Sequence, residues 1–240
     1  HLRELTDKNI KNLVIDLRQN PGGYLQAATE IADELLAGEK LIVYTQGKAS
    51  EKAEYLAGKP GLFEHGNLAI LIDQNSASAS EILAGAVQDW DRGTIIGRTS
   101  FGKGLVQEQY DLGDGSALRL TVARYYTPSG RNIQRPYTQG TEAYNEDIYE
   151  RYEKGEFVHE DTTHSDTLKY KTAKGRTVYG GGGIRPDIFV PLDTNGDFNY
   201  FYELRVLLPE FVYREYSNNP NFLADYKDMS ISKNVFKFRL

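Results

Sequence analysis

The sequence predicts an α/β fold, because short continuous apolar runs alternate with segments of helical periodicity over roughly the first 100 of its 240 residues. Continuous apolar runs are typical of strands buried on both faces of a parallel sheet. The content of hydrophobic residues, 40%, and of charged residues, 26%, is ordinary for a globular domain that buries a core. We therefore expect βαβ units around a mostly parallel sheet with both faces covered.

Four strands and two helices are expected in this first part. The turn residues Asn20-Pro21-Gly22-Gly23 end the first strand. Apolar residues recur at helical spacing from Leu25 to Leu36, and Gly38 suits the end of that helix. A second helix opens at 82–87, and the strands are expected at 13–17, 41–44, 68–72 and 94–96.

The pattern changes after residue 104. Two loosely alternating runs, 105–112 and 118–126, flank Gly113-Asp114-Gly115-Ser116 and predict a β-hairpin. Apolar residues at 199–215 predict a helix. We divide the chain into an α/β core over 1–135, a polar acidic insertion over 136–178, a returning strand within 179–196 and a helical, aromatic segment over 197–240.

Charge and composition exclude several classes of protein. The chain has 28 basic and 34 acidic residues, a net charge of −6, which argues against a dedicated nucleic-acid binder and against a polybasic membrane-surface protein. The absence of cysteine excludes thiol catalysis, disulfides and thiolate metal sites. The opening residues resemble the tail of a helix that enters a strand, with no signal peptide, so we expect a piece of a longer protein.

The segment Asn75–Glu81 is the first candidate for chemistry. Small side chains between an apolar strand and an apolar helix allow a tight turn that presents a serine hydroxyl. The unpaired N–H groups at the start of the helix could stabilise an oxyanion. The spacing Ser78-x-x-Glu81 also matches a helix capping box, and one serine can serve both purposes.

A serine nucleophile needs a base, and two residues are candidates. His65, in a loop near the expected core, would give a Ser–His–Asp triad, although a surface histidine is the more ordinary interpretation. A lysine can also serve when burial lowers the pKa of its amine from about 10.4. Lys103 lies between Gly102 and Gly104, which let the backbone turn sharply.

Other motifs are incomplete. The run Gly97-x-x-x-x-Gly102-Lys103 resembles a phosphate-binding loop, but Gly104 replaces the magnesium ligand and a strand is expected next. Ser100-x-x-Lys103 lacks the companion motifs of penicillin-binding proteins. The pair His159 and His164 is spaced too widely for a zinc helix, and the segment 193–197 lacks a full set of calcium ligands.

Taken together, four pieces of the sequence resemble the carboxy-terminal processing, or tail-specific, peptidases. Their co-occurrence in order is more specific than any single motif. The resemblance covers residues 12–135 and resumes at 183–192. The four pieces are Asp16-Leu17-Arg18-Gln19-Asn20-Pro21-Gly22-Gly23, Ser76-Ala77-Ser78-Ala79-Ser80-Glu81, Thr99-Ser100-Phe101-Gly102-Lys103-Gly104-Leu105-Val106-Gln107 and Gly183-Ile184-Arg185-Pro186-Asp187.

The resemblance assigns roles to individual residues. It implies a Ser-Lys dyad in which Ser78 is the nucleophile and Lys103 the base, with Gln107 orienting the lysine on the same face of an extended segment. It implies an oxyanion hole formed by the N–H of Ala79 and that of Gly22 or Gly23. Asp16, Arg18 and Glu81 match family positions near the site, and Arg18 could equally form a buried carboxylate pair that shapes the loop.

The resemblance further implies a crotonase-like core and a serine endopeptidase that cleaves C-terminal tails of proteins, with no cofactor and no metal. It implies an extracytoplasmic setting, and a homo-oligomer is possible. The family usually carries a PDZ domain, for which the residues before position 12 have no room. The alternatives are a non-catalytic scaffold of the same fold that binds peptides, and a P-loop-like nucleotide binder.

Overall fold

The computed structural model describes residues 1–136, 140–160, 168–193, 213–214 and 217–218. The chain divides into two units, 1–192 and 193–240. All helices and strands named below belong to the first unit. The helix expected over 199–215 and most of the segment 197–240 lie outside the described residues.

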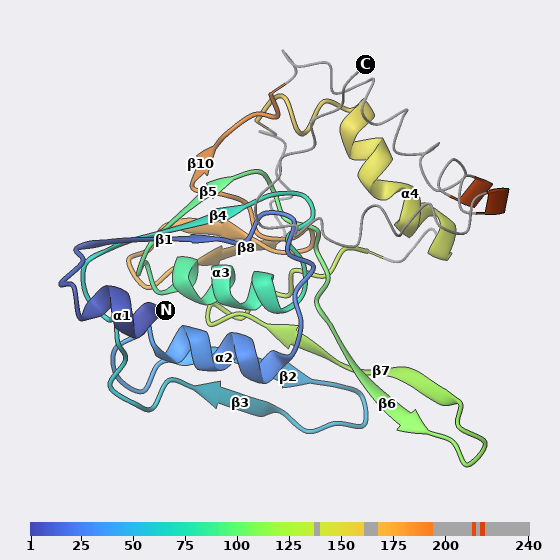
Figure 1. Cartoon of the computed structure of the whole chain (residues 1–240), viewed down its shortest axis with the longest axis horizontal. Helices are drawn as coiled ribbons and strands as arrows, with labels where there is room; N and C mark the ends of the chain where they lie inside the picture. The colour runs from blue at the N-terminus through green and yellow to red at the C-terminus, as the bar shows by residue number, and fades with distance from the viewer. Residues whose placement is uncertain (137–139, 161–167, 194–212, 215–216, 219–240) are drawn as a thin grey trace. The chain divides into compact units, whose positions relative to one another are not determined.

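A parallel four-stranded sheet forms one layer of the first unit (Figure 1). After the short helix α1 (Leu2–Thr6), strand β1 (Asn12–Asp16) pairs with β4 (Asn67–Ile72). Strand β4 pairs with β5 (Thr94–Gly97), and β5 pairs with β10 (Ile188–Phe189), all in parallel. The apolar runs at these positions therefore form strands of one sheet, as predicted.

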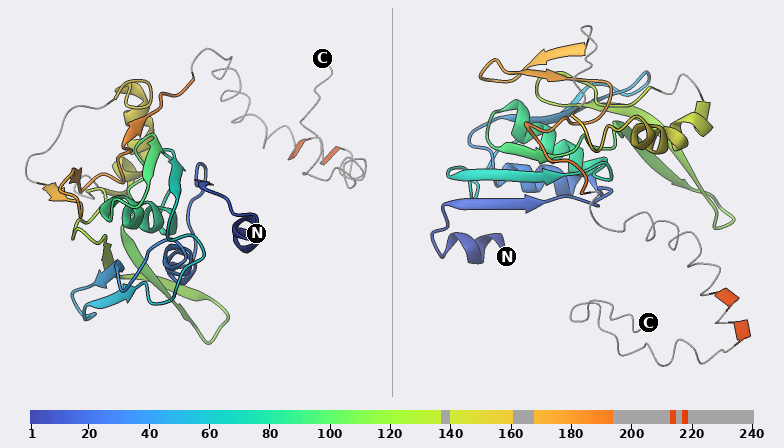
Figure 2. Two further views of the ribbon diagram at one scale, coloured as in Figure 1. Left: turned by 90° about the vertical axis from the view of Figure 1, so that its left-hand side faces the viewer. Right: turned by 90° about the horizontal axis from the view of Figure 1, so that it is seen from above.

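Two helices lie on the inner side of this sheet, where α3 (Ala79–Asp89) packs against β5 and α2 (Leu25–Asp33) packs against α3. Helix α2 ends earlier than expected, and α3 has every residue buried. A helix buried on all sides must contact neighbours all around. Figures 1 and 2 show why: α3 lies between the parallel sheet and a second, antiparallel sheet. The core joins these layers through Leu35, Ile42, Ile70, Leu83 and Ile95.

The second sheet has the strand order β3-β2-β7-β6 and is antiparallel. Strand β2 (Leu41–Gln46) pairs with β3 (Ala53–Leu56) on one side. On the other side it pairs with β7 (Ala117–Tyr126), which forms a hairpin with β6 (Leu105–Asp111). The hairpin was predicted, whereas β3 is not among the strands expected from the sequence.

Two parts of the predicted sheet arrangement are wrong. Strand β2 was expected in the parallel sheet but belongs to the antiparallel one, because periodicity predicts a strand and not its partner. The parallel sheet was expected to be covered on both faces, yet Val14 and Ile188 on its outer side are 60% and 52% exposed. In the described part of the chain, α3 packs against the inner face of the sheet, whereas these two outer residues stay exposed.

The remaining elements follow the hairpin. Residues 136–178 include helix α4 (Gly140–Glu153) and strand β8 (Lys169–Lys171), which pairs with β9 (Thr177–Tyr179). Phe157, between these elements, is buried. None of the described helices is long and apolar enough to cross a lipid bilayer.

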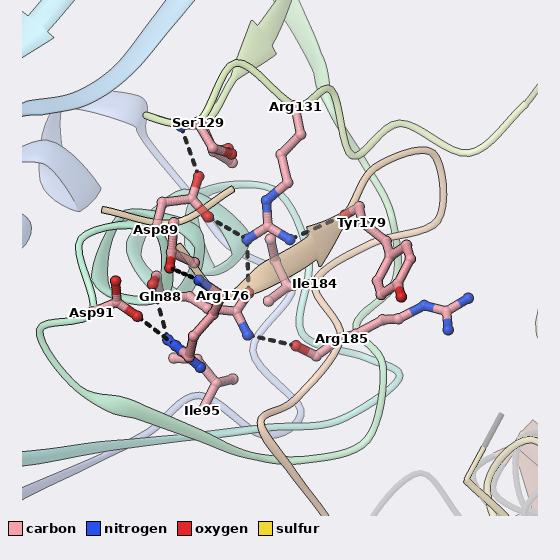
Figure 3. A network of polar contacts seen from close by, with 12 residues as sticks. Gln88, Asp89, Asp91, Ile95, Ser129, Arg131, Arg176, Tyr179, Ile184 and Arg185 are labelled. Atoms are coloured by element: carbon pink, nitrogen blue, oxygen red, sulfur yellow. Dashed lines mark hydrogen bonds and ion pairs between the residues drawn. The ribbon is translucent and has the colours of Figure 1, made fainter. Parts of the chain in front are cut away.

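A polar network, which we name the latch, fastens the segment after β8 to the end of α3 (Figure 3). Arg131, fully buried, donates to Asp89 at 2.8 Å, to Gln88 at 2.7 Å and to the carbonyl of Tyr179 at 3.0 Å. Gln88 in turn donates to the carbonyl of Arg185 at 2.8 Å. Since a buried charge is costly without partners, these contacts fix the returning strand on the core.

Candidate active site

The turn between β4 and α3 holds three serines in different environments. The hydroxyl of Ser76 donates to the carbonyl of Leu17 at 2.8 Å, and that of Ser80 donates to the carbonyl of Asn20 at 3.1 Å. Both serines are buried and tie the turn to the chain after β1. Ser78, half-buried between them, lines a cavity with its side chain. Ser76 and Ser80 therefore anchor the turn, whereas Ser78 lines the cavity.

Ser78 has a backbone conformation that is rare for a residue with a side chain. Its φ is +56° and its ψ is −116°, and it is the N-cap of α3. Such strain persists only where the surroundings enforce it, and it is typical of a nucleophile on a strand-to-helix turn. The predicted capping box is present, with the N–H of Ser78 donating to Oε2 of Glu81 at 2.8 Å.

The glycine loop after β1 presses directly on this turn. A Cβ at Gly22 would lie 2.4 Å from the carbonyl oxygen of Ala77 and 2.7 Å from the amide nitrogen of Ala79. The φ of Gly22 is +93°, a conformation that glycine adopts without strain. Its N–H donates to Oδ1 of Asn20 at 2.9 Å. The glycine is thus required for the close approach of two backbones beside Ser78.

A cavity of about 680 Å³ brings together most of the predicted site. Ser78, Ala79, Lys103, Gln107 and Gly23 all line it, whereas Gly22 is not among the lining residues. The rest of the lining is largely apolar and comes from α2, α3 and the β6–β7 hairpin: Tyr24, Leu25, Ile82, Leu105, Val106, Gln109, Arg119 and Tyr125.

Glu81 connects the turn that contains Ser78 to the loop that contains Lys103. Its fully buried carboxylate accepts from the N–H groups of Ser78 at 2.8 Å and Lys103 at 2.9 Å through Oε2. Through Oε1 it accepts from the hydroxyl of Ser100 at 2.5 Å and the N–H of Gly102 at 2.7 Å. Burial raises the pKa of Glu81, and these four donated hydrogen bonds oppose that rise. Glu81 therefore fixes the two backbones relative to each other.

Tyr125 on β7 is a site residue that the sequence did not reveal. Its hydroxyl lies 3.1 Å from the carbonyl oxygen of Ser78 and also contacts the carbonyl oxygen of Lys103. The ring is buried, 2% exposed, and lines the cavity. The hairpin pattern predicted a strand at this position, but no sequence signal showed that the strand would pass beneath the serine and the lysine.

Gln107 reaches the cavity by a route different from the predicted one. Simple alternation from Lys103 was expected to put both side chains on one face. Strand β6 begins only at Leu105, and its register with β7 shifts between Val106 and Gln107. Lys103 and Gln107 both line the cavity, although simple alternation does not hold between them.

Asp16 and Arg18 form a pair away from the cavity. Arg18 donates to Oδ1 of Asp16 from Nε at 2.9 Å and to Oδ2 from Nη2 at 2.7 Å. The hydrogen bond from Arg18 is the main cause that holds the pKa of Asp16 below its usual value. The expected buried pair is corrected, because the two side chains are 55% and 48% exposed.

The other sequence candidates do not join this cavity. His65 is exposed and does not line it. Strand β6 follows Gly104, so the helix that a P-loop requires is not formed there. Residues 161–167 and 194–197 of the two metal-like motifs lie outside the described residues, and the described part of the chain holds no group of three or more potential metal ligands.

Sequence comparisons show which known proteins this chain resembles. Residues 1–143 match the pattern of the family described as Peptidase family S41. The chain is 39% identical over 218 residues to a carboxy-terminal-processing protease of Bartonella bacilliformis, covering 90% of this chain and 48% of that protein. It is 38% identical over 148 residues to carboxy-terminal processing protease CtpB of Bacillus subtilis, covering 62% of this chain and 31% of that protein.

Solved structures give the same result for the fold. A photosystem II D1 C-terminal processing protease superposes with a TM-score of 0.55 at 28% identity, covering 79% of this chain and 37% of that chain. The chain spans about half or less of the length of these relatives. Since the family pattern matches more than half of its residues, this chain belongs to peptidase family S41, and its relatives there include carboxy-terminal-processing proteases.

Proposed function

We propose that this protein is a serine endopeptidase that uses a Ser-Lys dyad to cleave the C-terminal tails of protein substrates. The observation that carries the proposal is the shared cavity of Ser78 and Lys103, whose backbones are both hydrogen-bonded to the carboxylate of Glu81. Membership of a protease family supports protein or peptide substrates.

The chemistry follows from the roles of three side chains. Ser78 Oγ attacks the scissile carbonyl carbon, and the neutral amine of Lys103 takes the hydroxyl proton. The protonated amine then gives that proton to the leaving nitrogen, which breaks the peptide bond and leaves an acyl-enzyme. Water, deprotonated by the same amine, hydrolyses the ester. Gln107 orients the lysine during these transfers.

Backbone amides provide the oxyanion hole in this proposal. The N–H of Ala79 lies at the first position of α3, where the helix dipole favours negative charge. For the second donor, Gly23 is preferred over Gly22, because the N–H of Gly22 already donates to Asn20. Gly23 lines the cavity, and a Cβ there would meet no atom within 4 Å.

Three broader expectations belong to the same proposal. The arrangement of a parallel sheet, a buried helix and a second sheet supports a crotonase-like core. The proposal includes an extracytoplasmic setting for the whole protein, as the family resemblance implies. The proposal also includes association into a homo-oligomer.

The test is cleavage of an unstructured tail peptide by the full-length protein and its variants, followed by mass spectrometry of products and of acyl-enzyme. Ser78→Ala and Lys103→Ala are expected to lower kcat by at least about 10³-fold, since each removes a reacting group. Matched controls are Ser50→Ala and Lys59→Ala, whose residues lie outside the cavity and should leave turnover near that of the wild type.

Two results would contradict the proposal. One is a cleavage rate near wild type in Ser78→Ala or Lys103→Ala. The other is a protein that binds the peptide without shortening it, which would support the non-catalytic scaffold. Thermal stabilisation by ATP would favour the nucleotide-binding alternative instead.

A further inference from the structure

The β6–β7 hairpin has two chemically different faces. Cross-strand pairs put Gln107, Gln109 and Arg119 on one face, and these three residues line the active-site cavity. Tyr110 and Leu118 form a pair on the opposite face, where they are 46% exposed. Figure 1 shows the hairpin extending beyond the packed layers. The polar face therefore continues the floor of the cavity outward along the hairpin.

The charged side chains that line the cavity are all basic in the described part of the chain. Lys103 and Arg119 are the only charged residues among those that line it, and no carboxylate does so. This contrasts with the chain as a whole, whose net charge is −6. If Lys103 serves as a neutral base, Arg119 is the one remaining charge on the wall of the cavity. Such a site favours a ligand that carries negative charge.

The contacts of Arg119 leave its charge uncompensated in the described part of the chain. Its Nη2 donates to Oε1 of Gln109 at 3.0 Å, and Nε2 of Gln109 donates to Oδ1 of Asp111 at 3.0 Å. Gln109 thus separates the guanidinium from the nearest carboxylate of the same face. By contrast, Arg18, Arg131 and Arg176 each form an ion pair with an aspartate. The guanidinium group of Arg119 is held in place by the neutral amide of Gln109. Its remaining N–H groups can donate to a planar carboxylate.

We propose that Arg119 is a specificity-determining residue that binds a carboxylate of the peptide substrate. This inference rests on the proposed peptidase function and names a substrate class for it: tails with an acidic group near the scissile bond. The carboxylate can come from a glutamate or aspartate side chain or from the free C-terminus of the tail, since both present the same pair of oxygens.

The register of the hairpin gives the approximate position of that carboxylate. Arg119 pairs with Gln109, which lies two residues beyond Gln107, the residue proposed to orient Lys103. Two residues of an extended strand span about 6.6 Å, and an extended peptide along the hairpin advances at the same rate. Allowing for the length of the arginine side chain, the acidic group lies about two to four residues from the scissile bond.

The experiment measures kcat/KM of the full-length protein on uncharged tail peptides that carry one Glu or one Gln at successive positions around the scissile bond. Each peptide is made with a free C-terminal carboxylate and with a C-terminal amide, which distinguishes the two sources. We expect the wild type to prefer one acidic form by about twofold to fivefold, the range for a partly exposed ion pair, and less as salt rises. Arg119→Gln should remove the preference, and Arg119→Glu should reverse it in favour of a lysine-containing peptide.

The matched control is Arg124→Gln, because Arg124 is exposed on the same strand and does not line the cavity. An unchanged preference in Arg119→Gln, or an equal loss in Arg124→Gln, would overturn the inference while cleavage itself stands. Peptide affinity is measured in parallel on the Ser78→Ala background by fluorescence anisotropy. If the wild type cleaves no peptide, the proposed function fails, and equal affinities of the Glu and Gln peptides would then refute the role of Arg119 separately.

Discussion

Two side chains hold the reacting groups together at the scale of single residues. Glu81 binds the N–H groups of Ser78 and Lys103, and Tyr125 lies against the carbonyl groups of the same two residues. The proposed nucleophile and the proposed base therefore share the same two hydrogen-bonding partners. Positioning of this kind contributes to catalysis because small displacements of reacting atoms cost much of the rate.

Tyr125→Phe is predicted to lower kcat with little change in KM. The ring would keep its packing in the core, while the hydroxyl contacts with the two carbonyls are lost. We expect kcat to fall about 10- to 100-fold, because the dyad is no longer held at its separation, with a stability loss of about 1 kcal/mol. Steady-state kinetics and urea denaturation measure the two effects.

The control for this prediction is Tyr126→Phe. Tyr126 stacks on Tyr44 with ring centroids 4.8 Å apart and does not line the cavity. Equal losses of kcat in the two variants, or a rise in KM that accounts for the whole effect in Tyr125→Phe, would show that the hydroxyl does not position the dyad.

Gly22→Ala is predicted to destabilise the protein as well as inactivate it. The new methyl group would lie 2.4 Å from the carbonyl oxygen of Ala77, and a φ of +93° is strained for alanine. We expect a loss of about 3 kcal/mol or more in the free energy of unfolding, the sum of overpacking and backbone strain.

Gly23→Ala is the control variant for the stability of Gly22→Ala, because a Cβ at Gly23 would meet no atom within 4 Å. It should change the free energy of unfolding by less than about 1 kcal/mol. Chemical denaturation of both variants gives the difference, and similar losses would mean that the close approach at Gly22 is unimportant.

At the scale of elements, ion pairs connect the end of α3 to the strands that come last in the first unit. Arg176, between β8 and β9, donates to Asp91 and to Asp187, each at 2.5 Å. Asp91 follows α3 and Asp187 precedes β10. Together with the buried pair of Arg131 and Asp89 in the latch, these contacts connect β9 and β10 to the end of α3.

Asp91→Asn is predicted to destabilise the protein in a pH-dependent way. Burial opposes ionisation of Asp91, but hydrogen bonds from Arg176 and the N–H of Lys174 outweigh it and hold its pKa below the usual 3.8. A lowered pKa means that the ionised group stabilises the folded state above pH 3.8 and that this contribution is lost as the pH falls further. At pH 7 the variant should be about 1 to 2 kcal/mol less stable.

Urea denaturation of wild type and Asp91→Asn from pH 7 down to below pH 3.8 measures the effect. The difference between the two proteins should shrink toward the acid end. Asp7→Asn, at the exposed end of α1, should stay within about 0.5 kcal/mol of the wild type throughout. A difference that is constant with pH would refute the role of the ionised Asp91.

At the scale of the whole molecule, the cavity that holds the proposed catalytic residues and the described core lie in one unit. The core residues run from Leu13 to Ile184, and the cavity residues run from Gly23 to Tyr125, so both sets fall within residues 1–192. The last strand, β10, closes the parallel sheet just before that unit ends. This unit therefore contains what a cooperative fold requires.

A chain shortened to residues 1–192 is predicted to keep a single cooperative unfolding transition. We expect its free energy of unfolding to stay within about 2 kcal/mol of that of the 240-residue chain, because the described hydrophobic core is retained. Urea denaturation followed by circular dichroism measures it. Ending the chain at residue 178 instead, which removes β10 and part of β9, should abolish the transition.

Persistence of the transition in the chain ending at residue 178 would show that the latch and β10 are dispensable. Loss of the transition in the chain of residues 1–192 would show that stability depends on the segment 193–240. The two shortened chains therefore test the unit boundary from both sides.

The amino-acid sequence by itself determined the elements and the family. Apolar runs predicted four strands, helical spacing predicted α2 and α3, and the glycine turn predicted the hairpin, because each is a local property of the chain. Four motifs in order indicated the protease family, and residue matches nominated Ser78, Lys103 and Gln107. The structure places these three in one cavity.

Only the tertiary structure decided which strands pair and what surrounds the site. The sequence could not show that β2 leaves the parallel sheet, that Tyr125 reaches the carbonyl of Ser78, or that Arg119 joins the cavity wall. Nor could it show that Asp16 and Arg18 pair outside the cavity, half exposed. The physical reason is that periodicity and turn chemistry act over a few residues, whereas pairing and burial depend on segments far apart in the chain.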